Sequence, residues 1–409
     1  MILSYYKLIY FLPIALITGP FLPDLIIVLC SLLFVFDTFR LKLFKYFNNI
    51  FFKVFFVFFI TLNLSSFFSE NLMSLKYSLG YLRYGIFSIL LFYILKNIKN
   101  SKLIISYSII FTYIILLIDG YLQFIFGKNI FLFEIQKYNE NASYVTSFFN
   151  DEKKLGSFLA KMFPLFLFSI SIIRNKLITI KLEKFISLFF VLIFLMIILT
   201  TERVSIFVFL SLILIVFIKS EIFLKPKLIY FCITILSSII LFYYYPEFLY
   251  KIKSILYSTG LVHPGYSNDG KVLGEYDVGK FVFSKFHHEQ IKSSIYLFLE
   301  NPLLGIGAKN YKYMFVGGWH PHNYTFQILA EIGIFGFLIF FSSIIFLLFK
   351  FIKKFFKPID KHLNSEINIY LLAGILLNLI PIPSGDFFNN WVNILIYFPV
   401  GYYLYLNEK

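Results

Sequence analysis

The chain has 409 residues, of which 59% are hydrophobic, 22% aromatic and only 14% charged, and its mean hydropathy is +0.80. These values lie far outside the range of soluble domains and predict an all-α protein that crosses a membrane many times. The net charge of +15 does not indicate a nucleic-acid-binding protein, because the basic residues form short clusters at the edges of apolar segments and no basic domain is present.

Apolar stretches of roughly membrane-spanning length recur along the chain, and short polar or basic patches separate them. We expect about twelve transmembrane helices from this pattern. They lie near residues 5–18, 21–37, 50–66, 78–95, 103–120, 155–173, 184–201, 203–218, 227–244, 323–350, 367–381 and 389–406. The first two segments are short because Pro13, Gly19 and Pro20 interrupt them.

Lysine and arginine accumulate in alternate loops, and short basic loops stay on the cytoplasmic side of a membrane. These loops contain Arg40, Lys42 and Lys45; Lys96, Lys99 and Lys102; Arg174, Lys176, Lys181 and Lys184; Lys219, Lys225 and Lys227; and Lys350, Lys353, Lys354, Lys357 and Lys361. Both termini are therefore expected in the cytoplasm. The segments near 67–77, 121–154, 245–321 and 382–388 are expected on the outer face.

Three regions follow from this arrangement. Residues 1–244 hold the first nine segments with the outer stretch 121–154, residues 245–322 form one large outer loop, and residues 323–409 hold the last three segments. A short amphipathic helix is predicted in the loop from about 287 to 299, lying on the membrane surface. Its apolar residues at helical spacing are Ile291, Ile295, Phe298 and Leu299, and Asn301-Pro302 ends it. Gly305-Ile306-Gly307 follows no strand, so we interpret it as a turn rather than a phosphate-binding loop.

The two cysteines and the N-terminus carry structural expectations. Cys30 and Cys232 lie in separate hydrophobic segments, so we expect buried reduced thiols and no disulfide. No small-residue cleavage site follows a basic start, so the first hydrophobic segment is expected to stay as a membrane anchor.

The run from Gly318 to Asn323, Gly-Trp-His-Pro-His-Asn, lies where the large loop meets the tenth segment and holds two of the six histidines. An imidazole that titrates near neutrality at a membrane edge is suited to move a proton for a substrate that is partly lipid and partly polar. Two alternatives stay open: His320 and His322 bind a metal ion, although no further ligand lies nearby, or His322 makes ordinary hydrogen bonds at a helix start.

The residues after the histidines have helical spacing. Asn323 is a candidate N-cap, and Gln327 and Glu331 follow it at i, i+4 intervals on an otherwise apolar helix. We expect this polar face to line a cavity.

Arginine is rare in this lysine-rich chain. Arg83 lies a little over one turn inside the fourth segment, and Arg203 ends the tight turn Thr201-Glu202-Arg203. An ionised group at mid-helix costs roughly 2.5–3.5 kcal/mol on insertion, so it usually faces an interior or a water-filled cavity. A guanidinium there could grip phosphate, or Arg203 could pair with Glu202 or extend to the interface.

Several motifs occur in a fixed order. The stretch from His320 to Gly336 reads His-Pro-His-Asn-Tyr-Thr-Phe-Gln-Ile-Leu-Ala-Glu-Ile-Gly-Ile-Phe-Gly. The others are Asp119-Gly120 with Gln123 and Gly127; Phe149-Asn150-Asp151-Glu152 with Gly156-Ser157; Thr201-Glu202-Arg203; Asn301-Pro302-Leu303-Leu304-Gly305-Ile306-Gly307; and Ser384-Gly385-Asp386-Phe387-Phe388-Asn389-Asn390-Trp391. In these residues most of the chain resembles the bacterial O-antigen ligases and the related O-antigen polymerases, which are multi-span glycosyltransferases.

One region departs from that resemblance. Many members carry an arginine at the start of the surface helix, where this chain has His287-His288. The large loop holds no arginine, so a second phosphate-binding cation would be one of its lysines or be absent. The candidates among them are Lys280, Lys285, Lys292 and Lys309.

The resemblance implies a reaction at the periplasmic face of the bacterial inner membrane. A glycan would pass from undecaprenyl diphosphate to a hydroxyl of lipid A-core in lipopolysaccharide biosynthesis, with inversion and without a metal ion or other cofactor. Arg203 would stabilise the diphosphate and His322 would accept the acceptor's proton. The further substrate-binding candidates are Arg83, Glu152, His320, Asn323, Gln327, Lys309 and His287. For Glu152 the alternative is a solvated charge patch with Lys153 and Lys154.

Other activities give different expectations. A polymerase would join lipid-linked repeat units with the same donor chemistry. A polysaccharide transporter or flippase needs broken helices with charges near the bilayer midplane, which the sequence does not display. A purely structural membrane protein would need no polar cluster on the outer face.

Overall fold

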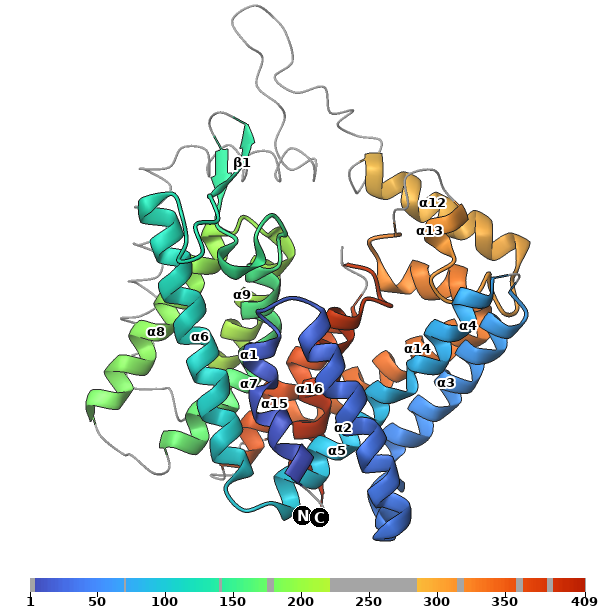
Figure 1. Ribbon diagram of the computed structural model, residues 1–409, viewed down its shortest axis with the longest axis horizontal. Helices are drawn as coiled ribbons and strands as arrows, with labels where there is room; N and C mark the ends of the chain where they lie inside the picture. The colour runs from blue at the N-terminus through green and yellow to red at the C-terminus, as the bar shows by residue number, and fades with distance from the viewer. Residues whose placement is uncertain are drawn as a thin grey trace, which may run out of the picture.

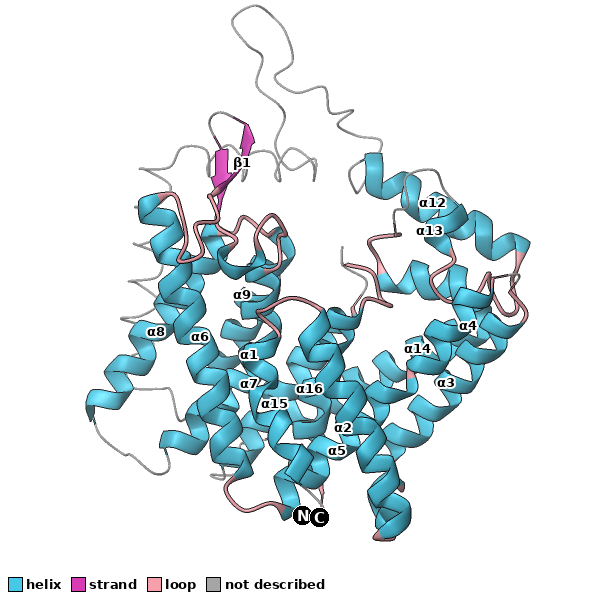
Figure 2. Cartoon of the chain, viewed as in Figure 1, coloured by secondary structure: helices cyan, strands magenta, loops and turns pink. Residues whose placement is uncertain are grey.

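The computed structural model describes residues 4–69, 71–139, 142–174, 180–220, 285–314, 320–357, 363–380 and 385–408. This part of the chain is mostly helical, as Figure 2 shows, with one small antiparallel sheet. Short 3-10 helices span Ser4–Phe11, Leu43–Phe47 and Ser147–Phe149. The α-helices before the large loop are α1 (Leu12–Ala15), α2 (Phe21–Arg40), α3 (Ile50–Phe67), α4 (Leu72–Gly80), α5 (Leu82–Asn97), α6 (Ser101–Phe126), α7 (Leu155–Arg174), α8 (Ile180–Leu199) and α9 (Arg203–Lys219). Those after it are α12 (Lys285–Glu300), α13 (Tyr311–Met314), α14 (Tyr324–Phe355), α15 (Leu363–Leu379) and α16 (Asn390–Asn407). The strands are β1 (Gln136–Asn139) and β2 (Ala142–Tyr144).

The multi-pass, all-α prediction is confirmed. Each expected apolar segment that the structure describes is helical, and the segment 227–244, with Cys232, lies outside the described residues. Six helical stretches among the described residues are long and apolar enough to cross a membrane. These are Phe21–Arg40, Ile50–Phe67, Leu72–Asn97, Ser101–Phe126, Leu155–Ile173 and Tyr324–Phe355. The total of about twelve spans and the large outer loop stay predictions.

The basic loops share one face of the bundle. Both termini are marked at the lower edge of Figure 1. Three lysines from two of these basic clusters bind the C-terminal end of α16 there: Lys96 pairs with Glu408, Lys102 donates to the Tyr405 hydroxyl, and Lys354 donates to Asn407. The sheet and α12 lie at the opposite, upper face (Figure 1), which is the face that carries the motifs identified from the sequence.

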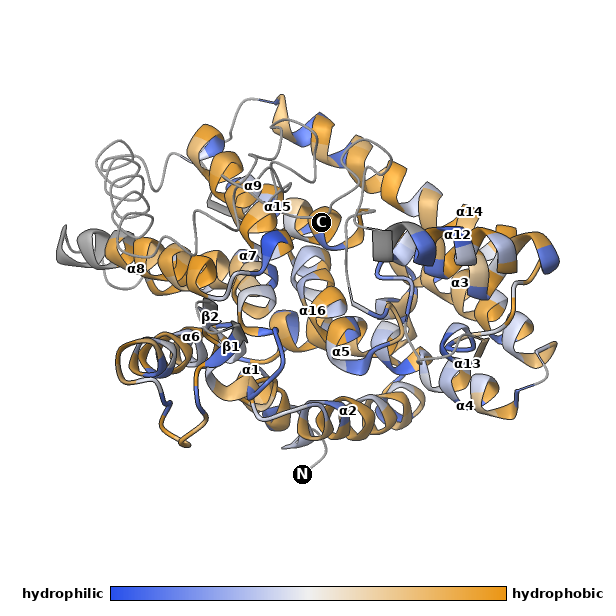
Figure 3. Ribbon diagram, turned by 90° about the horizontal axis from the view of Figure 1, so that it is seen from above, coloured by the Kyte–Doolittle hydropathy of each residue, from blue (hydrophilic) through white to orange (hydrophobic). Residues whose placement is uncertain are grey.

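Helix α16 is the centre of the bundle. Its residues from Trp391 to Tyr403 are all buried, and in the view from above it lies near the middle, with α2, α3, α6 and α8 toward the rim (Figure 3). A helix that is apolar all round is stable only when other helices enclose it. Aromatic rings fill the contact with α5, where Tyr84 and Tyr397 stack with centroids 5.8 Å apart. The peripheral helices instead turn large apolar side chains outward, as Phe36 and Phe349 do.

Two polar side chains of α6 hold the segment that follows it. Asp119 is fully buried and accepts hydrogen bonds from the Ile130 backbone N–H and the Ser147 hydroxyl. Gln123 accepts from the backbone N–H groups of Thr146 and Ser147. This early motif therefore fixes the path of residues 127–139 and 142–149 over the upper face.

Helix α14 is broken at Gly333, whose backbone has φ +70° and ψ −165°. The segment 301–310 docks against the break. Ile306 and Gly307 donate to the carbonyls of Ala330 and Glu331 at 3.0 and 2.9 Å, and Ile334 donates to the Pro302 carbonyl at 2.9 Å. These bonds replace the helical bonds that the break removes. The prediction of a turn at Gly305-Ile306-Gly307 is confirmed, whereas the absence of a broken helix inferred from the sequence is wrong.

Glycine is required on both sides of this contact. A Cβ atom at Gly333 would lie 2.4 Å from the Leu303 carbonyl oxygen, and one at Gly305, where φ is +71°, would lie 2.5 Å from the Glu331 carbonyl carbon. Backbone meets backbone at both positions, so no side-chain rearrangement would relieve the overlap.

The helix predicted near 287–299 is confirmed as α12, but it buries a different stripe from the one expected, and its position on the membrane surface stays a prediction. Leu297 packs with Ile306, Tyr311 and Ala330 at the start of α14, whereas Ile295 and Leu299 are 40% and 68% exposed. Burial of Leu297 joins α12 to the loop that fills the break, so the two features form one unit.

The break gives the first prediction. We expect Gly333→Ala to lower the midpoint of thermal unfolding of the purified protein in detergent, because it combines a left-handed φ with overlap against Leu303. Gly127→Ala is the matched control: its φ is +76° with open space around the Cβ, so it should cost only roughly 1–2 kcal/mol. Equal shifts for the two variants would contradict the required close approach.

Candidate functional site

The Glu202 carboxylate joins the starts of α7 and α9. It accepts hydrogen bonds from the backbone N–H groups of Gly156 and Ser157 at 2.8 Å, and from the hydroxyl groups of Ser157 at 2.7 Å and Ser205 at 2.8 Å. Burial raises the pKa of the Glu202 carboxyl, and these hydrogen bonds oppose that shift. Because Arg203 is the next residue and begins α9, the carboxylate fixes its backbone at the upper face, where its side chain is exposed.

The candidate histidines lie directly before α14. The rings of His320 and His322 have centroids 4.0 Å apart, and His322 has a left-handed φ of +51°. Asn323 is the N-cap of α14, as expected, since its side-chain oxygen accepts from the Thr325 and Phe326 backbone N–H groups. This capping bond and the tight turn orient both imidazoles at the helix start. Among the described residues, no group of three or more His, Cys, Asp or Glu side chains could hold a metal ion.

One lysine lies near both candidate elements. The Lys161 ammonium of α7 lies 5.9 Å from the centroid of the Tyr324 ring at the start of α14, and its charge interacts with the Glu202 carboxylate. The Lys154 ammonium at the start of α7 lies 5.5 Å from the centre of the Trp391 ring at the start of α16. The starts of α7, α9, α14 and α16 are therefore neighbours, and their backbone N–H dipoles point to the same face.

Gln327 and Glu331 are buried in a network that holds two loops. The Gln327 amide donates to Glu331 at 3.2 Å and to Asp386 at 2.6 Å, and its oxygen accepts from the Phe387 backbone N–H at 2.8 Å. The Tyr311 backbone N–H donates to Glu331 at 3.0 Å. Gln327 and Glu331 are each 1% exposed, so they position the loops beside α14 rather than line an open cavity as expected from the sequence.

Lys309 is the loop lysine that the structure places beside this network. Its ammonium lies 4.1 Å from the centre of the Tyr77 ring, and it interacts with the charges of Asp386, Glu331 and Arg83. Burial lowers the pKa of Lys309, and the two carboxylates partly oppose that effect. The side chains of Lys285 and His287 on α12, and all of Lys280, lie outside the described residues. Lys292 is exposed on α12.

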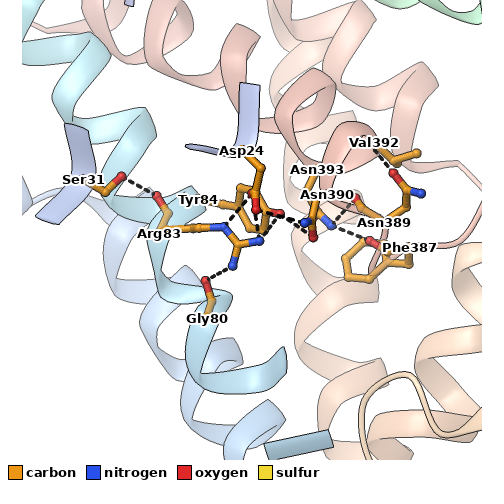
Figure 4. Close-up of polar contacts among 10 residues, drawn as sticks. All are labelled: Asp24, Ser31, Gly80, Arg83, Tyr84, Phe387, Asn389, Asn390, Val392 and Asn393. Atoms are coloured by element: carbon orange, nitrogen blue, oxygen red, sulfur yellow. Dashed lines mark hydrogen bonds and ion pairs between the residues drawn. The ribbon is translucent and has the colours of Figure 1, made fainter. Parts of the chain in front are cut away.

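Arg83 belongs to a closed ring of polar contacts that ties α5 to α2 and α16 (Figure 4). Its guanidinium donates to Asp24 at 3.1 Å, to the Gly80 carbonyl at 2.6 Å and to the Tyr84 hydroxyl at 2.8 Å. Tyr84 donates to the Asn390 side-chain oxygen, and the Asn390 amide donates to Asp24 at 3.1 Å. Arg83 therefore faces the protein interior as expected. Its N–H groups donate to protein atoms, and the ring of contacts that they form holds α2, α5 and α16 together.

Glu152 forms an ion pair with Lys154 and is 55% exposed. The structure thus shows the solvated charge pair that was the alternative for this residue. Lys154 also covers Trp391, so the pair lies against the start of α16.

Sequence reasoning missed Asp24 as the partner of Arg83, and it missed Lys161. Each is a charge within an apolar segment, and Lys161 is four residues after Ser157 on the same face of α7. An isolated charge inside a span was the signal that would have found them.

The Gln327 network gives the second prediction. Gln327→Glu puts a third carboxyl group between Glu331 and Asp386 and removes the shared donor, which costs roughly 1–3 kcal/mol per unsatisfied buried group. We expect a lower thermal midpoint, with a larger deficit at pH 8 than at pH 5, because acid reduces the repulsion between the carboxylates. The control Gln136→Glu, on the exposed strand β1, should change little; the same shift for both would disprove the network's role.

The ion pair between Arg83 and Asp24 gives the third prediction. A double-mutant cycle with Arg83→Met and Asp24→Asn should show a coupling free energy of about 0.5–3 kcal/mol in the free energy of unfolding. Each single variant leaves the other, partly buried charge without its partner. The exposed pair Lys96–Glu408 is the matched control and should couple by less than about 1 kcal/mol. Additive effects at Arg83 and Asp24 would rule out the ring as a stabilising unit.

Comparison with known families covers the centre of this site. Residues 188–341 match the family model described as O-Antigen ligase. A comparison with curated proteins returns no match. The matched stretch contains Arg203, α12, both histidines and the break at Gly333, and in this stretch the chain is similar to the O-antigen ligases.

Proposed function

We propose that the protein transfers a glycan from undecaprenyl diphosphate to an acceptor hydroxyl, with lipid A-core as the acceptor, at the periplasmic face of the bacterial inner membrane. The family match supports a membrane glycosyltransferase of the O-antigen ligase type, acting in general on a lipid-linked glycan and an acceptor. The observation that carries the finer proposal is the meeting of the α9 start, with Arg203, and the α14 start, after His322, beside the upper end of α7.

In the proposed reaction, the bond between the anomeric carbon and the diphosphate oxygen breaks while the acceptor oxygen bonds to the same carbon from the opposite side, which inverts the configuration. The acceptor's proton passes to the His322 imidazole and then to solvent. The leaving diphosphate keeps the electron pair of the broken bond, and the Arg203 guanidinium stabilises the growing negative charge. Undecaprenyl diphosphate then leaves the site.

The remaining candidates divide by their contacts. We assign His320 and Lys309 to substrate contact, since the His320 ring lies next to the His322 ring and Lys309 lies in the loop docked on α14. We assign Asn323 and Gln327 to positioning, because their amides cap α14 and hold Asp386. The ion pairs of Arg83 and Glu152 support a structural role for these two residues. His287 stays a proposed substrate contact from the surface helix.

The side of the membrane is part of the proposal. Lys96, Lys102 and Lys354 from the basic loops lie at the lower face with the end of α16. Short basic loops are retained in the cytoplasm, which would put the upper face outside.

A broken helix is also a feature of transporters, so the break in α14 must be compared with the transporter alternative. In transporters, unwound carbonyl groups commonly coordinate a coupling ion. Here the Ala330 and Glu331 carbonyls accept hydrogen bonds from Ile306 and Gly307, and Ser65 also donates to Glu331 at 2.7 Å. These carbonyls are already satisfied by protein donors, so the break favours docking of a loop rather than an ion path.

The test is complementation of a strain that lacks the chain. We expect Arg203→Ala and His322→Ala to insert normally and to lower glycan transfer by roughly 100-fold or more, since each removes a group acting in the transition state. Arg40→Ala and His362→Ala, both in predicted cytoplasmic loops, are the controls and should transfer normally. Surface polysaccharide is compared on gels together with membrane levels of each variant.

The pattern on the gel also separates ligase from polymerase. Loss of all core-attached polymer while lipid-linked polymer accumulates supports ligase. A core with a single repeat unit supports polymerase. Wild-type transfer by both site variants at normal membrane levels would refute the proposed chemistry.

A further inference from the structure

Helix α7 carries one charge inside its apolar run. Between Leu155 and Ile173, Lys161 is the single Asp, Glu, Lys or Arg residue. It lies six residues after the helix start, which is about 9 Å along the axis at 1.5 Å per residue. A charge at this depth is costly unless it faces a polar interior or a ligand, so its surroundings decide what it does.

The Lys161 ammonium lies near the starts of α9 and α14, the helices that begin at Arg203 and directly after the histidines. Ser157, one turn earlier on the same face of α7, binds Glu202 immediately before α9. On the other side, the ammonium lies 5.9 Å from the Tyr324 ring, two residues after His322. The ammonium is thus placed between the start of α9 and the start of α14.

No described group forms an ion pair or a hydrogen bond with the Lys161 ammonium. The Glu202 carboxylate interacts with it electrostatically, but both oxygens of that carboxylate already accept hydrogen bonds from the backbone and hydroxyl groups of α7 and α9. Among the residues that the structure describes, Lys161 makes no hydrogen bond and no ion pair. Within the described part of the chain, its three N–H donors are therefore available to an anion that enters between α9 and α14.

We infer that Lys161 is a second cation for the diphosphate of the lipid-linked donor, acting with Arg203. This inference rests on the proposed function. A diphosphate has two phosphate groups and needs more positive charge than a single guanidinium supplies, and the large loop has no arginine to contribute. Lys161 is fixed on a transmembrane helix, so it supplies a rigidly held point charge where a loop lysine would first have to be ordered.

A purely structural part for Lys161 makes a different prediction. If its ammonium only balances the buried Glu202 carboxylate, replacing it should reduce stability and affect every lipid phosphate alike. If it contacts the diphosphate, replacing it should weaken binding of a diphosphate more than binding of a monophosphate, because Arg203 alone suffices for one phosphate group.

The experiment measures binding of undecaprenyl diphosphate and undecaprenyl phosphate to the full chain in phosphatidylcholine nanodiscs, with no glycan or acceptor present. Lys161→Gln should weaken diphosphate binding by about 10-fold or more and monophosphate binding by less than about 3-fold, as expected for loss of a charge-assisted contact. Lys161→Arg, which keeps the charge, should stay within about 3-fold of wild type. Lys219→Gln, at the opposite end of α9, controls for removal of one lysine and should bind both lipids normally.

The outcomes separate this inference from the function on which it rests. Equal diphosphate binding by Lys161→Gln and wild type, with weak binding by Arg203→Ala, overturns the role of Lys161 and leaves the proposed function standing. An equal loss for both lipids, together with a lower thermal midpoint, also overturns it in favour of the structural part. Failure of the wild type to bind undecaprenyl diphosphate overturns both. If Lys161→Gln does not fold, Lys161→Met takes its place, since it keeps the apolar stem.

Discussion

The Glu202 carboxylate, which accepts four hydrogen bonds from α7 and α9, is the interaction on which the arrangement of the upper face depends. Helices that start at a membrane surface leave N–H groups without partners, and a carboxylate satisfies them while it favours the positive end of the helix dipole. Asp119 is used in the same way against the Ile130 backbone N–H, and Asp386 accepts from the Phe388 backbone N–H. Several carboxylates of this face thus accept hydrogen bonds from backbone N–H groups. The cations beside them keep more of their charge for an anionic ligand.

The break at Gly333 is the second constraint, and it connects the surface helix with the candidate histidines. Residues 301–310 fill the gap in α14 with backbone hydrogen bonds, and Leu297 of α12 packs on the same segment. The first turns of α14 are therefore held from both sides, by this loop and by the Gln327 contacts to Asp386 and Phe387. An imidazole that must meet an acceptor hydroxyl at hydrogen-bond distance gains from such a rigid support. Residues 301–310 and α12 therefore support the candidate site through their contacts with α14.

The stretch that matches the O-antigen ligase family model contains the starts of α9 and α14, which the structure brings near the upper end of α7. The match covers residues 188–341, whereas Lys161, Arg83 and Asp386 lie outside it. Lys161 and Asp386 nevertheless interact with the matched stretch, Lys161 through the charge of Glu202 and Asp386 through its hydrogen bond with Gln327. The proposed donor site is accordingly assembled from the whole bundle, and the matched stretch alone would lack one of its two proposed cations.

The sequence by itself determined the helices, the shared face of the basic loops, the cap at Asn323 and the turn at Gly305-Ile306-Gly307. All of these depend on local order: apolar length, charge at a segment's end, and the conformations that asparagine and glycine allow. Only the tertiary structure decided the break in α14, the burial of Gln327 and Glu331, the pairing of Arg83 with Asp24 and the position of Lys161. Each of those depends on which distant group lies within a few ångströms. A helical pattern shows which side of a helix is polar, but whether a polar group meets water, a backbone donor or an opposite charge depends on the packing of its neighbours.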